Sequence, residues 1–206
     1  MYDDVPQRYR DPLRRYHELI EYREHFCYTV TTPLTLNEAV RRIGMREADL
    51  VPAPERETLA EEGCLLIGQV GPAVVTFDEV GVGRFMRNAH ALGNGCDYGI
   101  AQWDYYNRAF AYIRRDGSGG SWDEERRDTE ESSEELIAGW QEGALAEYAV
   151  LFQRYLQEDE ADGEGGDPVY LEAVMLTILE LETGVRLDDE LIDSLPYALH
   201  LPSTLS

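Results

Sequence analysis

The stretch CLLIGQVGPAVVTF, residues 64–77, decides the fold class of this chain. It consists of two nearly continuous apolar runs, Cys64–Val70 and Ala73–Phe77, with Gly71 and Pro72 between them. Glycine and proline in that place are turn residues, and short apolar runs bounded by them are typical of strands. Runs without polar alternation belong to strands that are covered on both faces. The stretch therefore predicts two neighbouring strands in the middle of a sheet rather than at its edge.

A second antiparallel pair is predicted further along the chain. Tyr98–Trp103 and Arg108–Ile113 have the composition of strands, and residues 104–107 between them have the length of a hairpin loop. Upstream, Phe26–Thr31 is aromatic and β-branched, and it is either a short strand or the end of the helix before it. The predicted sheet is small and mainly antiparallel, and it lies within residues 64–113.

Apolar residues at helical spacing predict helices on both sides of this sheet. The first begins at Pro12, after a polar lead-in, and a second covers residues 36–43 behind a capping box at Thr35–Glu38. Further helices are predicted over 84–92, 145–156, 168–182 and 188–195. We therefore expect a single α+β domain over residues 1–206, with an N-terminal helical segment and a C-terminal helical set from 132–195.

Two acidic segments that contain glycine, residues 116–131 and 158–167, are predicted to be mobile. The second also resembles a calcium-binding loop. If Gly163 is taken as the invariant loop glycine, the bidentate glutamate that such a loop needs falls on Val169. The segment therefore fails as an EF-hand, and we interpret it as a solvated linker.

The charge of the chain is large and uneven. It contains no lysine, so its 18 basic residues are all arginines, and with 41 carboxylates the net charge is −23. Residues 57–206 hold 31 of the carboxylates and nine arginines. The missing lysine excludes a phosphate-loop lysine, a Schiff base and a Ser–Lys dyad. Such a surface repels nucleic-acid phosphate and anionic membranes and attracts a basic partner, unless the charge serves only solubility.

The chain is expected to be a cytoplasmic protein without a membrane segment, a metal or a cofactor. No apolar run reaches the ~20 residues of a membrane span, and the first residues lack the basic and apolar regions of an export signal. Cys27, Cys64 and Cys96 are far apart and fit reduced, mostly buried thiols. No spacing of cysteine and histidine matches a zinc site.

Candidates for catalysis are sparse. Asp97 and Asp104 flank the predicted strand Tyr98–Trp103 and could face a pocket, with His90 as a further titratable group. A chain with 41 carboxylates places acids in this way by chance. We therefore predict no catalytic residue, with a small hydrolase that uses Asp97, Asp104 or His90 as the alternative.

Residues for contact with a partner are better supported. At the predicted hairpin loop, Trp103, Asp104, Tyr105 and Tyr106 would place three aromatic rings at a loop tip, where they anchor partners at low entropic cost. The alternative is that Trp103 and one tyrosine fold back onto the core. Acidic residues that would steer a basic partner are predicted in the segment that follows: Glu124, Glu125, Glu130 and Glu131.

Two segments resemble an uncharacterised actinobacterial family. The first combines Phe26–Val30 with Leu34–Gly44, where Leu34 and Thr35 precede Glu38, Ala39, Arg41 and Arg42. The second is Thr183–Leu187 followed by Glu190–Ile192. The middle of the chain departs from that family. The resemblance implies a related fold and an actinobacterial source, and it implies no reaction.

The function expected from the sequence is that of a non-enzymatic, acidic interaction protein. Its acidic surface would mask a basic surface of a partner protein, in the manner of an immunity or inhibitor protein. Neither nucleic acid nor membrane is expected as a direct partner, and the oligomeric state is left open. A regulatory scaffold, in which the charge only solvates the chain, is the third alternative.

Overall fold

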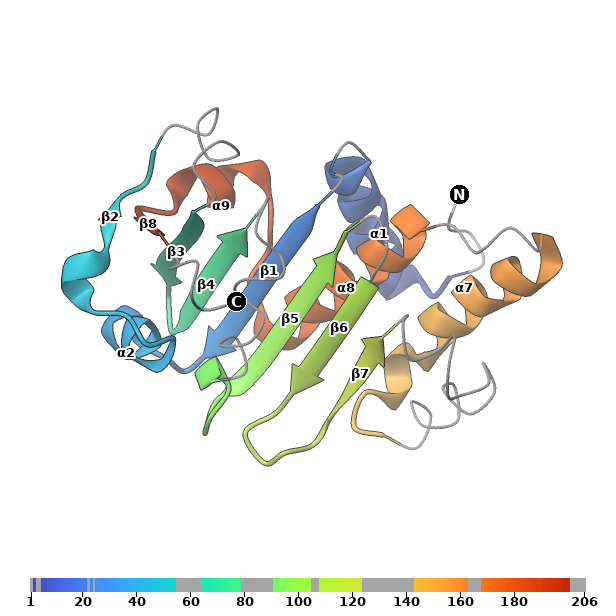
Figure 1. Cartoon of the computed structure of the whole chain (residues 1–206). Coiled ribbons are helices and arrows are strands. Elements are labelled where there is room, and N and C mark those ends of the chain that lie inside the picture. The colour runs from blue at the N-terminus through green and yellow to red at the C-terminus, as the bar shows by residue number, and fades with distance from the viewer. Residues whose placement is uncertain are drawn as a thin grey trace.

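An antiparallel sheet forms the middle of the molecule, and helices pack on it (Figure 1). The computed structural model describes residues 2, 5–21, 23, 25–54, 64–78, 91–104, 108–123, 143–162 and 168–200. Within these residues the sheet has eight strands in the order β2-β8-β3-β4-β1-β5-β6-β7. The predicted class is confirmed: one α+β domain in which helices from both ends of the chain pack together.

The element bounds are as follows. The strands are β1 (Phe26–Thr32), β2 (Val51–Pro52), β3 (Leu65–Val70), β4 (Ala73–Asp78), β5 (Asp97–Trp103), β6 (Arg108–Ile113), β7 (Gly119–Asp123) and β8 (Tyr197–Leu199). The α-helices are α1 (Gln7–Ile20), α2 (Leu36–Arg42), α7 (Ala149–Asp162), α8 (Pro168–Thr183) and α9 (Asp189–Ser194). Single turns of 3-10 helix lie at Glu47–Asp49 and Ala146–Tyr148.

β1 is the strand that joins the two predicted hairpins. The pairs β3–β4 and β5–β6 form as expected, and β1 lies between them, with Thr29 opposite both Thr76 and Ile100. Residues 26–31 are all buried, so both faces of this strand are covered and polar alternation is absent. Phe26–Thr31 is therefore part of a strand and not the end of the helix before it.

The sheet is larger than predicted and is not confined to residues 64–113. It includes β1 at its centre, and the C-terminal β8 pairs with β3 through Leu66 and Ala198. β2 has two residues and β8 has three. Strands of that length are too short for an alternation pattern to be read from sequence.

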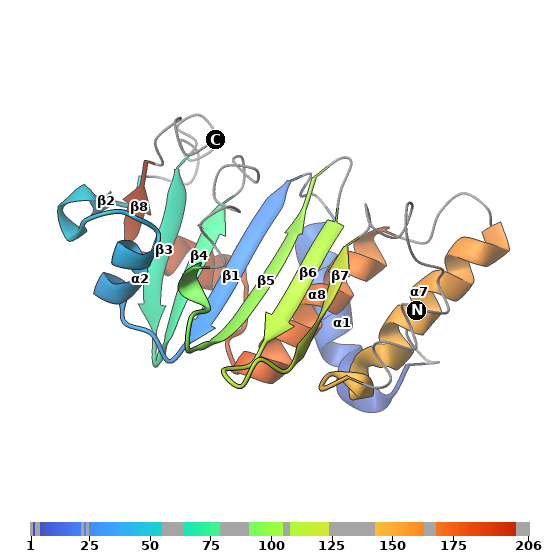
Figure 2. The ribbon, with the colours of Figure 1, turned by 60° about the horizontal axis from the view of Figure 1, so that its bottom comes forward.

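One face of the sheet, the helix face, is covered by α1 and α8 (Figure 2). Buried residues lie on all sides of α8, as its nearly uniform apolar sequence predicted. Gly99 on β5 makes room for this helix, since a Cβ there would collide with the side chain of Leu179. Despite its apolar character, neither α8 nor any other helix in the described residues is long and apolar enough to cross a membrane.

The other face carries α2, which lies at the β3 side of the sheet. This helix forms as predicted: the Thr35 hydroxyl accepts a hydrogen bond from the backbone N–H of Glu38 at 3.4 Å. The second half of the predicted capping box differs. The Glu38 carboxylate accepts hydrogen bonds from Arg41 and Arg42 instead, because both guanidinium groups lie one turn further along the helix.

Part of the segment 116–131, predicted to be mobile, belongs to the sheet. Gly119–Asp123 forms the edge strand β7, and this part of the prediction is wrong. Trp122 explains the difference, because it is buried on the helix face and stacks on Phe152 of α7 at a centroid distance of 5.0 Å. Residues 124–131 lie outside the described residues.

Two helix boundaries also differ from the prediction. α1 begins at Gln7 and contains Pro12 in its second turn, because Tyr9 on the first turn is buried and anchors it. α7 continues to Asp162, through a stretch predicted as linker, and residues 163–167 lie outside the described part of the chain.

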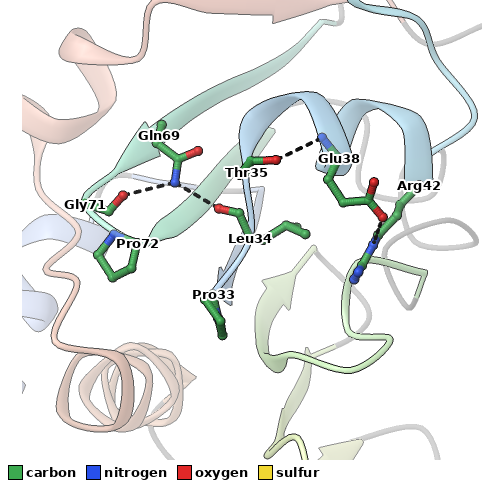
Figure 3. A pocket seen from close by; sticks show the side chains of 8 residues that line it. All are labelled: Pro33, Leu34, Thr35, Glu38, Arg42, Gln69, Gly71 and Pro72. Carbon is green, nitrogen blue, oxygen red and sulfur yellow. Dashed lines mark hydrogen bonds and ion pairs between the residues drawn. The ribbon is translucent and has the colours of Figure 1, made fainter.

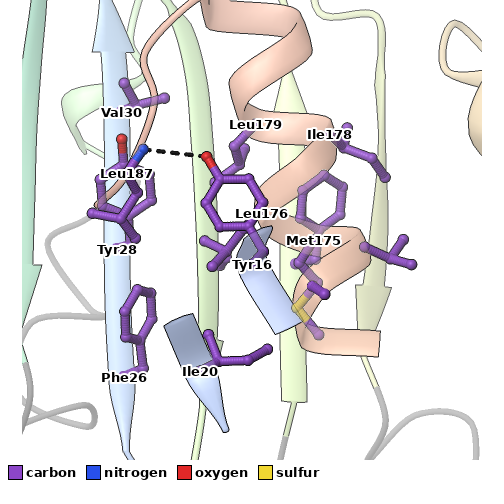
Figure 4. Packing of buried hydrophobic residues seen from close by; sticks show 14 of the residues in the cluster. Tyr16, Ile20, Phe26, Tyr28, Val30, Met175, Leu176, Ile178, Leu179 and Leu187 are labelled. Carbon is purple, nitrogen blue, oxygen red and sulfur yellow. Dashed lines mark hydrogen bonds between the residues drawn. The ribbon is translucent and has the colours of Figure 1, made fainter. Parts of the chain in front are cut away.

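Two buried tyrosines on the helix face form a matched pair for a stability test (Figure 4). The Tyr16 hydroxyl accepts a hydrogen bond from the backbone N–H of Leu187 at 3.2 Å. The hydroxyl of Tyr28 is buried and has no hydrogen-bond partner in the described structure. A buried polar group without a partner lowers stability, whereas removal of a used one leaves its partner unsatisfied.

We therefore expect opposite results from one chemical change. Tyr16→Phe should lower the free energy of unfolding by about 1–2 kcal/mol, because it leaves the Leu187 N–H without an acceptor. Tyr28→Phe should be neutral or stabilising. Urea unfolding at unchanged m-value measures both. An equal loss in the two variants would mean that the Tyr28 hydroxyl has a partner in solution.

Candidate functional site

The residues predicted to contact a partner do not form the aromatic loop tip that the sequence suggested. Trp103 is wrong as a docking residue, since it is 1% exposed and stacks on Phe26 with ring centroids 4.1 Å apart. Its indole N–H donates to the backbone carbonyl of Arg23 at 3.3 Å. The parity of β5 explains this: Trp103 and Ala101 point to the helix face. The alternative of a tryptophan folded onto the core is the observed one.

Most of the remaining predicted site residues lie outside the residues that the structure describes. Asp104 follows β5 directly and is half-buried. Four predicted partner residues from the acidic segment lie outside the described residues, as do two tyrosines and one histidine: Glu124, Glu125, Glu130, Glu131, Tyr105, Tyr106 and His90. Their roles stay predictions.

Asp97 and Asp104 lie at opposite ends of β5. A strand rises about 3.3 Å per residue, so the two Cα atoms are about 23 Å apart. Two carboxylates that act on one glycosidic bond are within about 10 Å of each other. Asp97 is moreover bound locally, because its Oδ1 accepts a hydrogen bond from the Arg115 N–H at 2.7 Å. The two carboxylates therefore do not form a common acid–base pair.

On the side of the sheet that faces away from α8, Tyr98 and Ile100 of β5 are buried in a second hydrophobic cluster to which α2 contributes. The part of this side that belongs to β6 and β7 is here called the open face (Figures 1 and 2).

Along β6, Phe110 and Tyr112 are buried on the helix face, and Ala109, Ala111 and Ile113 alternate with them. Ile113 is 42% exposed. The sequence holds a signal for this arrangement, since large and small residues alternate from Ala109 to Tyr112, but sequence analysis used it only to predict a strand.

A polar row borders the open face on the same side of the sheet. Cys27 lies opposite Asp78 on β4 and opposite Gln102 on β5. In the next row, the hydroxyls of Thr29 and Thr76 are 2.6 Å apart. The Gln102 Oε1 atom is buried and meets no donor within the part of the chain that the structure describes. Burial, together with the Asp78 carboxylate, raises the pKa of the Cys27 thiol well above its ordinary value, so this thiol is not a nucleophile at neutral pH.

A pocket of about 580 Å³ lies between the start of α2 and the turn from β3 to β4 (Figure 3). Gln69 occupies its wall and is bound to backbone on all sides. The amide nitrogen donates to the carbonyls of Leu34, Gly71 and Ala73, and its oxygen accepts from the Leu36 N–H at 2.8 Å. The hydrogen bonds of Gln69 hold the start of α2 on the sheet.

Many arginines of this protein are paired with carboxylates. Salt bridges with carboxylates are formed by at least nine of the described arginines: Arg8, Arg15, Arg23, Arg41, Arg42, Arg46, Arg108, Arg114 and Arg186. The side chains of Arg23 and Arg108 are 8% and 19% exposed. Five of these bridges join different elements, and the other four are local pairs, among them Arg41–Glu38 and Arg46–Asp49, whose arginines are exposed.

Several pKa shifts in the described residues lead away from neutral pH. Burial raises the pKa values of the Tyr28 and Tyr98 phenols, and it raises the pKa of Tyr112 to about 12. Hydrogen bonds from arginine lower the pKa values of Glu38 and Asp49. A general acid or base for neutral pH needs a pKa near 7. None of these shifts creates one.

Comparisons with protein-family models, with curated proteins and with solved structures find no match to this chain. The resemblance of residues 26–44 and 183–192 to an actinobacterial family therefore stays a prediction. The proposals that follow rest on the sequence and the structure.

The buried thiols give a direct test of this site. Cys27, Cys64 and Cys96 are all free and buried. In the native protein at pH about 8 a thiol reagent should label none of them rapidly, because access is blocked and the raised pKa of Cys27 suppresses its thiolate. In denaturant all three should react, and intact mass should show no loss of two hydrogens. Fast labelling of native Cys27 would contradict its place in the polar row.

Proposed function

We propose that this protein is a non-enzymatic interaction protein of the cytoplasm that binds and masks a basic surface of a partner protein, as immunity and inhibitor proteins do. The observation that carries the proposal is the net charge of −23 on 206 residues. Residues 116–167 alone hold 17 carboxylates and three arginines. At physiological salt such a field extends about 8 Å from the surface, so it acts on a partner during encounter and docking.

The way in which the fold uses its arginines supports this proposal. Salt bridges such as Arg15–Glu180 and Arg114–Glu182 hold cations against α8, where they add little to the outer field. Exposed arginines such as Arg41 and Arg46 are also paired with carboxylates, so the acidic field comes from the surplus of carboxylates over arginines in the chain. A basic protein surface complements this field, and phosphate backbones and anionic lipid headgroups do not.

The geometry also favours binding over catalysis. The two carboxylates that the sequence put forward for acid–base chemistry lie about 23 Å apart along one strand. The thiol of Cys27 is kept protonated by burial, which raises its pKa.

The experiment that tests the proposal uses the tagged chain, cross-linked to its neighbours in its own cells, and a matched variant with glutamine at Glu124, Glu125, Glu130 and Glu131. The variant keeps side-chain size and removes four charges. Proteins that the native chain captures and the variant does not should be basic, with isoelectric points above about 9. Capture of acidic proteins alone would contradict the proposal.

Binding kinetics with a partner identified in this way separate steering from docking. Between about 50 and 200 mM salt the association rate should fall severalfold while the dissociation rate changes less, and the four-glutamine variant should imitate high salt. Tyr105→Ala combined with Tyr106→Ala should instead raise the dissociation rate, because aromatic anchors act after encounter. If binding ignores both salt and the glutamine substitutions, the charge only solvates the chain and the proposal is wrong.

A further inference from the structure

The pocket between the start of α2 and the turn from β3 to β4, here called the α2 pocket, has the size of a small-molecule site (Figure 3). Its volume is about 580 Å³, and ligand pockets measure about 300–1,000 Å³. Its wall has an apolar part, formed by Pro33, Leu34, Gly71 and Pro72, and a charged part, formed by Glu38 and Arg42. A ligand with an apolar body and a polar end therefore matches it.

The α2 pocket is preformed and open to solvent. The Leu34 N–H donates to the Pro72 carbonyl at 3.1 Å, and the Gln69 amide nitrogen donates to the carbonyls of Leu34 and Gly71. These bonds tie the segment before α2 to the β3–β4 turn. Pro33, Gly71 and Pro72 are exposed, so a ligand can reach the apolar part of the wall. A preformed pocket binds without the entropic cost of ordering its wall.

Arg42 is held in place by three contacts and keeps unused donors. Its Nε atom donates to Oε1 of Glu38 at 2.9 Å, and its Nη1 atom donates to the carbonyl of Leu92 at 2.6 Å and contacts the Cys96 sulfur at 3.5 Å. Its Nη2 atom has no acceptor among the residues that the structure describes. The side chain is 22% exposed, so it is within reach of a ligand in the pocket. Carboxylates are the acceptors that a fixed guanidinium group binds strongly.

The charges around the α2 pocket allow an anion to approach. Both oxygens of Glu38 already accept hydrogen bonds, Oε1 from Arg42 and Oε2 from Arg41. Residues 33–50 hold three arginines and three carboxylates, and this segment is therefore neutral in a chain of net charge −23. Of those carboxylates, Glu38 lines the pocket and the other two do not. An anion is thus not repelled by this segment as it is by residues 116–167.

We infer that the α2 pocket binds a small organic carboxylate, whose apolar body packs on Pro33, Leu34 and Pro72 and whose carboxylate accepts hydrogen bonds from Nη2 of Arg42. Inorganic phosphate fits less well, because it needs several donors and the apolar side chains supply none. A cationic ligand is disfavoured, because two arginines already occupy the carboxylate of Glu38. The inference goes beyond the proposed function and does not rest on it.

The test uses two probes of the same shape, 2-naphthoate and its uncharged amide, 2-naphthamide, and follows the backbone amide signals of the full chain by NMR. Arg42→Lys keeps the positive charge and removes the guanidinium group. Glu38→Gln and Glu47→Gln each remove one negative charge from the same segment. Glu38 lines the pocket, whereas Glu47 is exposed outside it, so Glu47→Gln is the matched control for the change in charge.

We expect 2-naphthoate to shift the signals of residues 34–42 and 69–71 and to bind about tenfold more tightly than 2-naphthamide. Arg42→Lys should weaken the binding of 2-naphthoate by about tenfold. Glu38→Gln should strengthen it severalfold, because it removes a competing carboxylate and releases Nε of Arg42, and Glu47→Gln should change it by about twofold or less. A gain in affinity cannot come from a damaged fold, so Glu38→Gln decides the question even if Arg42→Lys does not fold.

Several outcomes would overturn the carboxylate site. They are equal binding of the two probes, equal effects of the two glutamine variants, unchanged binding in a folded Arg42→Lys variant, shifts confined to other parts of the chain, and no binding of 2-naphthoate at millimolar concentration. None of these results bears on the proposed function, which is tested with a basic protein partner.

Discussion

The packing of α8 on the centre of the sheet is the contact on which the rest of the structure depends. This helix is buried along most of its length, touches α1 on one side and β1 and β5 on the other, and fits because Gly99 carries no side chain. Its carboxylates fix its orientation: Glu172 binds Arg108 of β6 and Glu180 binds Arg15 of α1. Loss of one partner in such a half-buried pair leaves the other charge unsatisfied, which is strongly destabilising. The two ion pairs therefore fix the rotation and position of α8 on the sheet, which its nearly uniform apolar surface alone would not determine.

The elements that depend on local sequence could be predicted, and those that depend on distant pairing could not. The apolar runs of β3 and β4, the cap of α2 at Thr35 and the apolar helix α8 carry their signals within a few residues. The insertion of β1 between two hairpins carries no local signal, because each edge of a hairpin offers the same backbone hydrogen bonds to an incoming strand. Short strands such as β8 need a partner that is already in place, and here that partner lies more than a hundred residues earlier in the chain.

The candidate site was harder to predict than the fold, and Trp103 illustrates why. A tryptophan next to a hairpin loop can face either side of the sheet, and a shift of one residue in strand register exchanges the two. The sequence does not determine which side of the sheet α8 will cover. It therefore cannot show whether Trp103 anchors a partner or packs in the core. The same parity that buries Trp103 also turns Arg108 toward Glu172 and leaves Ile113 on the other face. The side of the sheet that α8 covers therefore determines both the wrong prediction for Trp103 and the exposure of Ile113.

The absence of lysine is consistent with this division between the two faces. A guanidinium group can serve several acceptors at once, and Arg42 does so by contacting Glu38, the carbonyl of Leu92 and the sulfur of Cys96. Arginines such as Arg23, Arg108 and Arg114 join elements in this way. A net charge of magnitude about 2–8 is enough to keep a small domain soluble, and a larger one destabilises the fold by self-repulsion. At −23 the chain is well beyond that range. Solubility alone is therefore a poor explanation of the excess, and a basic partner that neutralises it on binding would relieve the repulsion.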